Sequence, residues 1–289
     1  MKSLPDTVGP YKIVKKLGEG GFATVYLAYP QNRDDSQCVA LKVLKSRENY
    51  GRFQREIQTA ARLIHPNIVR IYDTGEDEET RTPFCSMEYV SGGTLFERLE
   101  AEHRLPREEA VEIIRHIGSA LIYPHQQDII HCDVNPKNIL LDPRYNPVRP
   151  ALTDFGLVKP LGLEGSELTD TIALVGTFAY YAPEQWNKEE VGPETDVYAL
   201  AITFFEMMSG RRPFEGDVFS LREKHLYQPL PRLSDFVPEI GPFFDEVLQK
   251  ATAKEPLERY ENVARFIEAL DAANEQARQD EWVMRRGRA

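Results

Sequence analysis

The amino-acid sequence predicts an α+β protein in which a small five-stranded β lobe with one helix precedes a larger, mainly helical lobe. Up to Tyr89 the chain consists of short runs rich in Val, Ile, Tyr and Phe, which are typical of strands. From Thr94 onward, apolar residues recur with a helical period. A chain of 289 residues, 42% of them hydrophobic, can bury a core large enough for two lobes.

Composition excludes several classes of function. The formal net charge of -11 argues against a general binder of nucleic acid or anionic membranes, because such proteins need a basic surface. Cys38, Cys85 and Cys132 are far apart and lack metal-ligand spacing, which indicates free thiols in a reducing compartment. The N-terminus has no apolar signal core, and no stretch approaches the roughly 18 apolar residues of a membrane span. We therefore expect a soluble, cytoplasmic chain that does not insert into membranes.

A glycine-rich turn separates the first two predicted strands, which run from Tyr11 to Val14 and from Thr24 to Ala28. The turn reads Leu-Gly-Glu-Gly-Gly-Phe-Ala over residues 17–23. Backbone amides in such a turn can cover phosphates, although a plain tight hairpin explains the same pattern and is the commoner case.

The third predicted strand, from Cys38 to Leu44, is apolar except for Lys42. A lysine in a buried strand is costly unless it meets an anion, although on an edge strand it reaches solvent. The helix expected from Arg52 to Ile64 carries Glu56, which is either a partner for this lysine or a solvated surface residue.

Two further strands, from Ile68 to Tyr72 and from Phe84 to Tyr89, complete the predicted sheet, and the stretch from Met87 to Gly93 then links the lobes. The helical lobe follows. Its later helices are expected from Thr195 to Met208, near Asp217 to Tyr227, from Phe243 to Ala253 and from Val263 to Ala277.

A polar loop between two apolar runs contains Asp133 and Asn138, and a second acid, Asp154, follows another apolar run just ahead of Gly156. Two carboxylates and a carboxamide that converge on one point suit metal ions and phosphates.

These motifs resemble those of the eukaryotic-type protein kinases, whose catalytic loop reads His-Arg-Asp, four residues, Asn, and whose metal-binding turn reads Asp-Phe-Gly. Here the loop begins at His131. The resemblance implies an ATP-dependent phosphotransferase in which Asp133 orients the substrate hydroxyl and Asn138 and Asp154 hold Mg²⁺. It also implies that Lys42, paired with Glu56, grips the phosphates of ATP.

The resemblance assigns further residues to the nucleotide site. Met87 is expected at the back of the adenine pocket, with backbone groups of Glu88 and Val90 facing adenine. Ala23 stands where the family has a third glycine. The full expected set is Leu17, Gly18, Gly20, Gly21, Ala23, Val25, Ala40, Lys42, Glu56, Met87, Glu88, Val90 and Leu140.

The resemblance also divides the chain. It implies an N-terminal extension over 1–10, a kinase domain over 11–270 and a C-terminal helix end with a basic tail over 271–289. Within the domain, the small lobe covers about 11–88, the hinge about 88–93 and the large lobe about 94–270.

Three features of the large lobe match the family. The loop before Ala182-Pro183-Glu184 resembles an activation segment, with Thr169 and Thr171 as expected autophosphorylation sites. Asp196 matches the aspartate that holds the catalytic-loop backbone. Arg259 matches the arginine that pairs with Glu184, although a surface arginine is the competing interpretation.

Two residues of the catalytic loop depart from the family pattern. Cys132 replaces the arginine that meets a phosphorylated activation loop, and Asn135 replaces a lysine that contacts the transferred phosphate. Lys137, two residues further on, is predicted to supply that cation and is counted with Asp133 and Asn138 as catalytic.

Three functions remain open at this point. We favour a serine/threonine protein kinase that acts on protein hydroxyls and on itself, because Gly176-Thr177 is typical of that subclass. The alternatives are a nucleotide-binding pseudokinase scaffold, suggested by Asn135 and Ala23, and a small-molecule kinase, which the long activation segment disfavours. Protein substrates are the expected partners, and the sequence names neither the substrate nor an oligomeric state.

Overall fold

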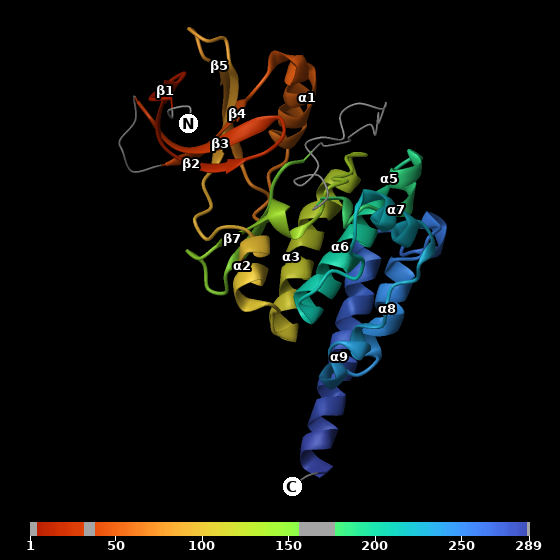
Figure 1. Ribbon diagram of the computed structural model, residues 1–289. Helices are drawn as coiled ribbons and strands as arrows, with labels where there is room; N and C mark the ends of the chain where they lie inside the picture. The colour runs from red at the N-terminus through yellow and green to blue at the C-terminus, as the bar shows by residue number, and fades with distance from the viewer. Residues whose placement is uncertain (1–4, 32–37, 156–176, 288–289) are drawn as a thin grey trace.

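The structure, a computed structural model, describes residues 5–31, 38–155 and 177–287. These residues form two lobes: an antiparallel sheet with one helix, and a larger body of helices beneath it (Figure 1). The predicted α+β, two-lobed fold is therefore confirmed.

The small lobe contains a six-stranded sheet in the order β1-β2-β3-β4-β6-β5. It holds the five predicted strands and one additional two-residue edge strand, β1. The bounds are β1 Thr7–Val8, β2 Tyr11–Glu19, β3 Ala23–Pro30, β4 Val39–Leu44, β5 Ile71–Glu76 and β6 Pro83–Glu88. All neighbouring pairs are antiparallel.

The fourth predicted strand begins later than expected, at Ile71 instead of Ile68. The backbone just before this strand pairs outside the sheet of the small lobe, because Ile68 forms a parallel bridge with Leu152 of the large lobe. The N–H of Val69 also donates to the carbonyl of Leu152, at 2.9 Å. This segment therefore joins the lobes before the chain enters the sheet.

Helix α1, Tyr50–Ala60, lies against the sheet through Phe53 and Ile57, which pack with Leu44 and Cys85. It ends four residues earlier than predicted. Ile64, the expected end of this helix, lies beyond it and is 72% exposed.

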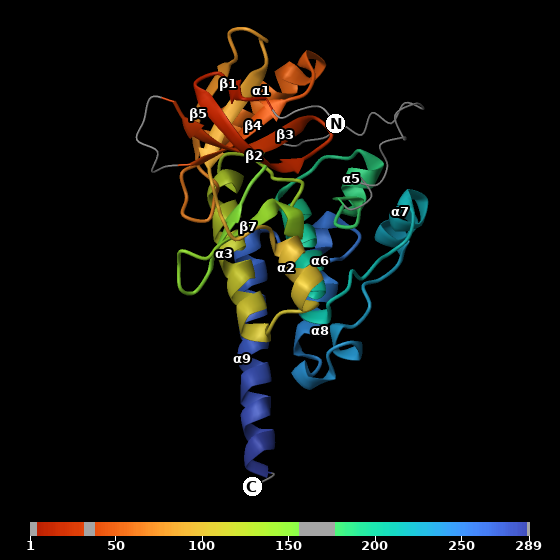
Figure 2. The same cartoon turned by 60° about the vertical axis from the view of Figure 1, so that its left-hand side comes forward.

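The large lobe is built around α6, which is buried at every position from Thr195 to Met208 and packs against α3, α8 and α9 (Figure 2). The helices are α2 Leu95–Glu102, α3 Arg107–His125, α5 Pro183–Asn187, α6 Pro193–Ser209, α7 Val218–Tyr227, α8 Phe243–Ala251 and α9 Val263–Gly287. Gly210 ends α6 with a φ of 73°, a conformation that glycine adopts without strain. Helix α9 is longer than predicted and extends beyond the lobe (Figures 1 and 2).

Short 3₁₀ helices and one hairpin connect these elements. The two-stranded hairpin of β7, Ile139–Asp142, and β8, Arg149–Leu152, follows the catalytic loop and lies between the lobes. The 3₁₀ helices are η1 Arg47–Asn49, η2 Pro136–Asn138, η3 Leu233–Asp235, η4 Pro238–Ile240 and η5 Pro256–Glu258.

Candidate active site

The backbone of the catalytic loop is fixed from below by Asp196, a fully buried residue of α6. The N–H groups of His131 and Cys132 each donate to its carboxylate at 2.9 Å. The Nε2 atom of His125 lies 2.8 Å from the same carboxylate. The predicted role of Asp196 in holding this loop is confirmed by these contacts.

The His131 ring supports the loop from the side. Its Nε2 donates to the carbonyl of Thr153 at 2.9 Å, and its Nδ1 accepts from the N–H of Asp133 at 3.2 Å. The ring also lies edge-on to Phe155, with centroids 4.7 Å apart. One neutral imidazole with its proton on Nε2 satisfies both hydrogen bonds and ties the loop to the segment that carries Asp154.

Two carboxamides hold the carboxylate of Asp133. The Nδ2 of Asn135 donates to Oδ1 at 3.0 Å, and the Nδ2 of Asn138 donates to Oδ2 at 3.0 Å. Both amides also donate to the backbone carbonyl of Asp133. Because Asn135 and Asn138 are themselves buried, the orientation of this carboxylate is set before any substrate arrives.

Cys132 is a buried thiol with a φ of 62° in the left-handed region. Its carbonyl accepts from the Nε2 of Gln185 on α5, at 2.8 Å. Burial, and then the neighbouring carboxylates of Asp196, Asp133 and Glu184, raise the pKa of the thiol. The side chain is therefore neutral and cannot make the bidentate contact with phosphate that an arginine makes at this position.

Lys42 and Asp154 meet across the cleft between the lobes. The Nζ of Lys42, on β4, lies 2.9 Å from Oδ1 of Asp154, which follows β8. Asp154 has a φ of 64°, which aspartate tolerates better than most side chains. A cation and a carboxylate that meet at one point suit a site for phosphates and a metal ion.

Glu56 is carried by α1, but its side chain lies outside the described part of the structure, so the expected pair with Lys42 remains a prediction. The activation segment over 156–176, with Thr169, Thr171 and Gly176, also lies outside the described residues.

The oxygen ligands predicted for Mg²⁺ come from two residues. Asn138 uses its amide nitrogen on Asp133, so its carbonyl oxygen is the atom that can coordinate a metal. Asp154 supplies a carboxylate. No group of three His, Cys, Asp or Glu residues lies close enough to hold an ion within the ranges that the structure describes. The pair fits Mg²⁺, which is commonly held by one or two side chains together with phosphate oxygens and water.

The glycine-rich turn closes through the N–H of Gly20, which donates to the carbonyl of Ala23 at 2.9 Å. A Cβ added at Gly18 or Gly21 would meet nothing within 4 Å, so packing inside the protein does not explain these glycines. A backbone without side chains on its exposed face lets the phosphates of a nucleotide approach it closely, which fits the predicted role of this turn. Glu19 in the same turn contacts Lys16 and Lys45, and the pKa of its carboxyl is lowered to about 2, mainly by hydrogen bonds to these lysines.

An apolar cluster from both lobes lies beside the hinge. It contains Ala40, Met87 and Val90, with Val25 and Leu140 packed against it. Five of the residues predicted for the nucleotide site are thus brought together. Leu17 lies apart from this cluster at the start of the glycine-rich turn and is 38% exposed.

The same cluster contains two residues that sequence reasoning missed, Val69 and Ala151. Each lies in a short apolar run, which was the available signal. The N–H of Glu88, at the end of β6, donates to the carbonyl of Arg70 at 2.8 Å, so of its two backbone groups the carbonyl is the one suited to adenine.

Lys137 is an exposed residue of η2, immediately before Asn138. Its ammonium lies over the ring of Phe96 on α2, 4.9 Å from the centroid. The sequence did not indicate this contact, because nothing in the local pattern places Phe96 beside the catalytic loop.

The predicted pair of Glu184 and Arg259 is confirmed. Two parallel hydrogen bonds of 2.8 Å join them, and both side chains are buried. Thr195 donates to the same carboxylate at 2.7 Å. This pair fixes the end of the activation segment to the helical core.

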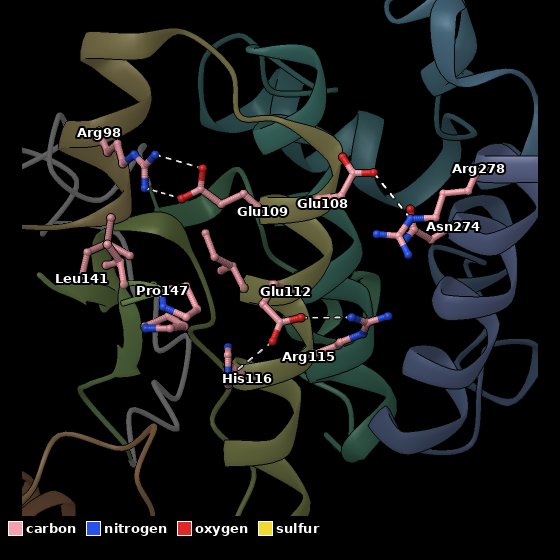
Figure 3. A pocket seen from close by; sticks show the side chains of 13 residues that line it. Arg98, Glu108, Glu109, Glu112, Arg115, His116, Leu141, Pro147, Asn274 and Arg278 are labelled. Atoms are coloured by element: carbon pink, nitrogen blue, oxygen red, sulfur yellow. Dashed lines mark hydrogen bonds and ion pairs between the residues drawn. The ribbon is translucent and has the colours of Figure 1, made fainter. Parts of the chain in front are cut away.

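A cavity of about 400 Å³ lies on the large lobe, among α2, α3, α9 and the β7–β8 hairpin. Figure 3 shows its charged side chains already joined to one another: Arg98 with Glu109, Arg278 with Glu108, and Arg115 with Glu112. None of the residues predicted for catalysis or metal binding lines it. We assign the phosphate chemistry to the cleft between the lobes instead.

The fold and this cleft are those of a protein kinase. The sequence matches the protein kinase domain family over residues 11–279, and the chain belongs to this family. Kinases of this family use ATP and a divalent metal.

Its relatives include serine/threonine-protein kinase PrkC of Bacillus subtilis, 39% identical over 88% of this chain and 39% of the relative. Serine/threonine-protein kinase PknJ of Mycobacterium tuberculosis is 36% identical over 94% of this chain and 47% of the relative. Among solved structures, the PknI kinase domain of Mycobacterium tuberculosis has a TM-score of 0.73 at 30% identity, covering 94% of this chain and 100% of that one. The chain thus spans less than half the length of these two curated relatives.

Within the described ranges, no helix combines the length and apolar character needed to cross a membrane. Cys38, Cys85 and Cys132, all within the described ranges, form no disulfide bond.

Proposed function

We propose that this chain is the catalytic domain of an ATP-dependent serine/threonine protein kinase that phosphorylates protein hydroxyls, including its own. The observation that carries the proposal is the contact of Lys42 with Asp154 across the cleft, beside a loop in which Asp133 is oriented by two amides. The serine/threonine-protein kinases among its relatives support the same specificity.

Phosphoryl transfer needs positioning and charge neutralisation more than covalent chemistry. Asp133 would accept a hydrogen bond from the acceptor hydroxyl and hold it in line with the γ-phosphate. Asn138 and Asp154 would hold Mg²⁺, which would neutralise charge on the phosphates. Lys42 would bind the phosphates from the small lobe, and the apolar cluster beside Met87 would take adenine.

The proposal extends to the chain's organisation and location. We place the kinase domain at 11–270, with the hinge at about 88–93. Three cysteines that form no disulfide bond, together with a requirement for ATP, fit an intracellular, cytoplasmic site of action. Protein substrates are the proposed partners. The overall negative charge argues against nucleic acid as a partner.

The test is transfer of labelled phosphate from ATP with Mg²⁺ to a generic protein substrate. Asp133→Asn and Asp154→Ala should each abolish transfer, whereas nucleotide binding measured by calorimetry should survive in Asp133→Asn. Binding of ATP without any transfer by the unaltered protein would support the pseudokinase instead. Transfer to metabolites but never to protein would support a small-molecule kinase.

A further inference from the structure

A cluster of charged residues lies at the hinge, where β6 of the small lobe meets the β7–β8 hairpin of the large lobe. We call Glu88, Asp142, Arg144 and Arg149 the hinge clamp. Glu88 ends β6, directly after Met87. The other three belong to the hairpin or its turn.

Arg149 is the centre of the clamp. Its guanidinium donates to Glu88 at 2.5 Å, to Asp142 at 3.0 Å and to the backbone carbonyl of Pro66 at 2.5 Å. Its planar face also lies over the ring of Tyr145, 5.1 Å from the centroid. One side chain thus joins the hinge, the hairpin and the segment that precedes β5.

Three of the four charges are shielded from water, whereas the side chain of Arg144 is 57% exposed. The side chain of Asp142 is fully buried, and those of Arg149 and Glu88 are 12% and 16% exposed. Hydrogen bonds from Arg144 first, and then from Arg149, lower the pKa of Asp142 to about 2. Because buried charges are costly when they lose a partner, the cluster resists rearrangement.

The geometry points to Arg149 as a positioning residue for the nucleotide, an inference that rests on the proposed function. The clamp holds the side chain of Glu88, whose backbone is predicted to face adenine, at a set distance from the hairpin. That hairpin contributes Leu140 and Ala151 to the apolar cluster expected to take the base. Arg149 therefore fixes the two walls of the adenine site relative to one another.

The test compares Arg149→Met with Arg107→Met, a matched control. Arg107 is also a buried arginine, 7% exposed, and binds Glu281 with both terminal nitrogens, but it joins α3 to α9 within the large lobe. Both variants should unfold at lower temperature. Only Arg149→Met should weaken binding of ATP with Mg²⁺, by about tenfold in calorimetry, given the coupling typical of such networks. The KM for ATP should rise with it, whereas the KM for the protein substrate should stay the same.

Two further variants keep the test decisive if Arg149→Met does not fold. Glu88→Gln leaves the Arg149–Asp142 pair intact and should weaken ATP binding by about threefold. Arg149→Lys should restore only part of the affinity, because one ammonium cannot reach all three partners.

Unchanged ATP affinity in Arg149→Met and Glu88→Gln, together with normal binding by the unaltered protein, would overturn this inference alone. An unaltered protein that bound no ATP would overturn the proposed function and this inference with it.

Discussion

Lys137 offers the sharpest test of how this catalytic loop compensates for its missing lysine. Its ammonium rests on Phe96, a contact worth about 0.5–1 kcal/mol at an exposed site. Binding a phosphate in a water-poor cleft is worth more, about 2 to 4 kcal/mol when the charge develops in the transition state. The ammonium of Lys137 can therefore leave the ring and bind the transferred phosphate with a net gain in free energy.

Replacement of Lys137 by Met should then lower kcat by about 30-fold to about 900-fold, with a much smaller change in ATP affinity. The matched control is Lys250→Met. Lys250 is also an exposed lysine, and it lies over the ring of Tyr260 at 4.6 Å, but on α8. Steady-state phosphorylation of one protein substrate, with ATP affinity measured separately, distinguishes the two variants.

The double variant Asn135→Lys with Lys137→Met should recover part of the loss, because it returns a lysine to the position where the family carries one. If Lys137→Met turned over as fast as Lys250→Met, the lysine would be a surface residue, and the proposed relocation of the cation would be wrong.

Three further outcomes are expected. Arg259→Met should lower the free energy of unfolding by about 3 to 5 kcal/mol in thermal denaturation, because it leaves the buried carboxylate of its partner unpaired. Arg265 is exposed, and Arg265→Met should change the free energy of unfolding much less. Equal effects of the two variants would contradict the reasoning. Alanine at both Thr169 and Thr171 should reduce activity only modestly, because the catalytic loop has no arginine ahead of its aspartate, and a hundredfold loss would refute this. Burial lowers the pKa of His225 from its ordinary value of 6.5 to about 3. The stability that His225 contributes is therefore complete above pH 6.5 and is lost as the pH falls toward 3. His225→Gln should flatten the plot of unfolding free energy against pH between these two values, and an unchanged slope would contradict this expectation.

Sequence reasoning located the residues of the site that lie close together along the chain. Asp133 and Asn138 occupy one short loop, so their spacing alone brings them into contact. Lys42 and Asp154 are far apart, and the family resemblance was needed to predict that they share a site. The contact itself depends on how the two lobes meet.

Other features could not be predicted because they depend on tertiary pairing. The delayed start of β5 follows from the bridge between Ile68 and Leu152, which no local pattern encodes. The hydrogen bond from Asn135 to Asp133 was missed because a family comparison shows what Asn135 replaces, not what it contacts. Arg149 was missed because an arginine in a short strand is indistinguishable from a solvated surface residue until its partners are known.

The attachment of the catalytic loop to Asp196 has a consequence for how the protein opens. The amides of His131 and Cys132 donate to a carboxylate on the most deeply buried helix of the large lobe, so they are exposed only when α6 itself loosens. Their hydrogen exchange should therefore follow the opening of the helical core and not that of the surface loops. We therefore expect the catalytic loop to open together with the helical core, although it lies at the edge of a cleft.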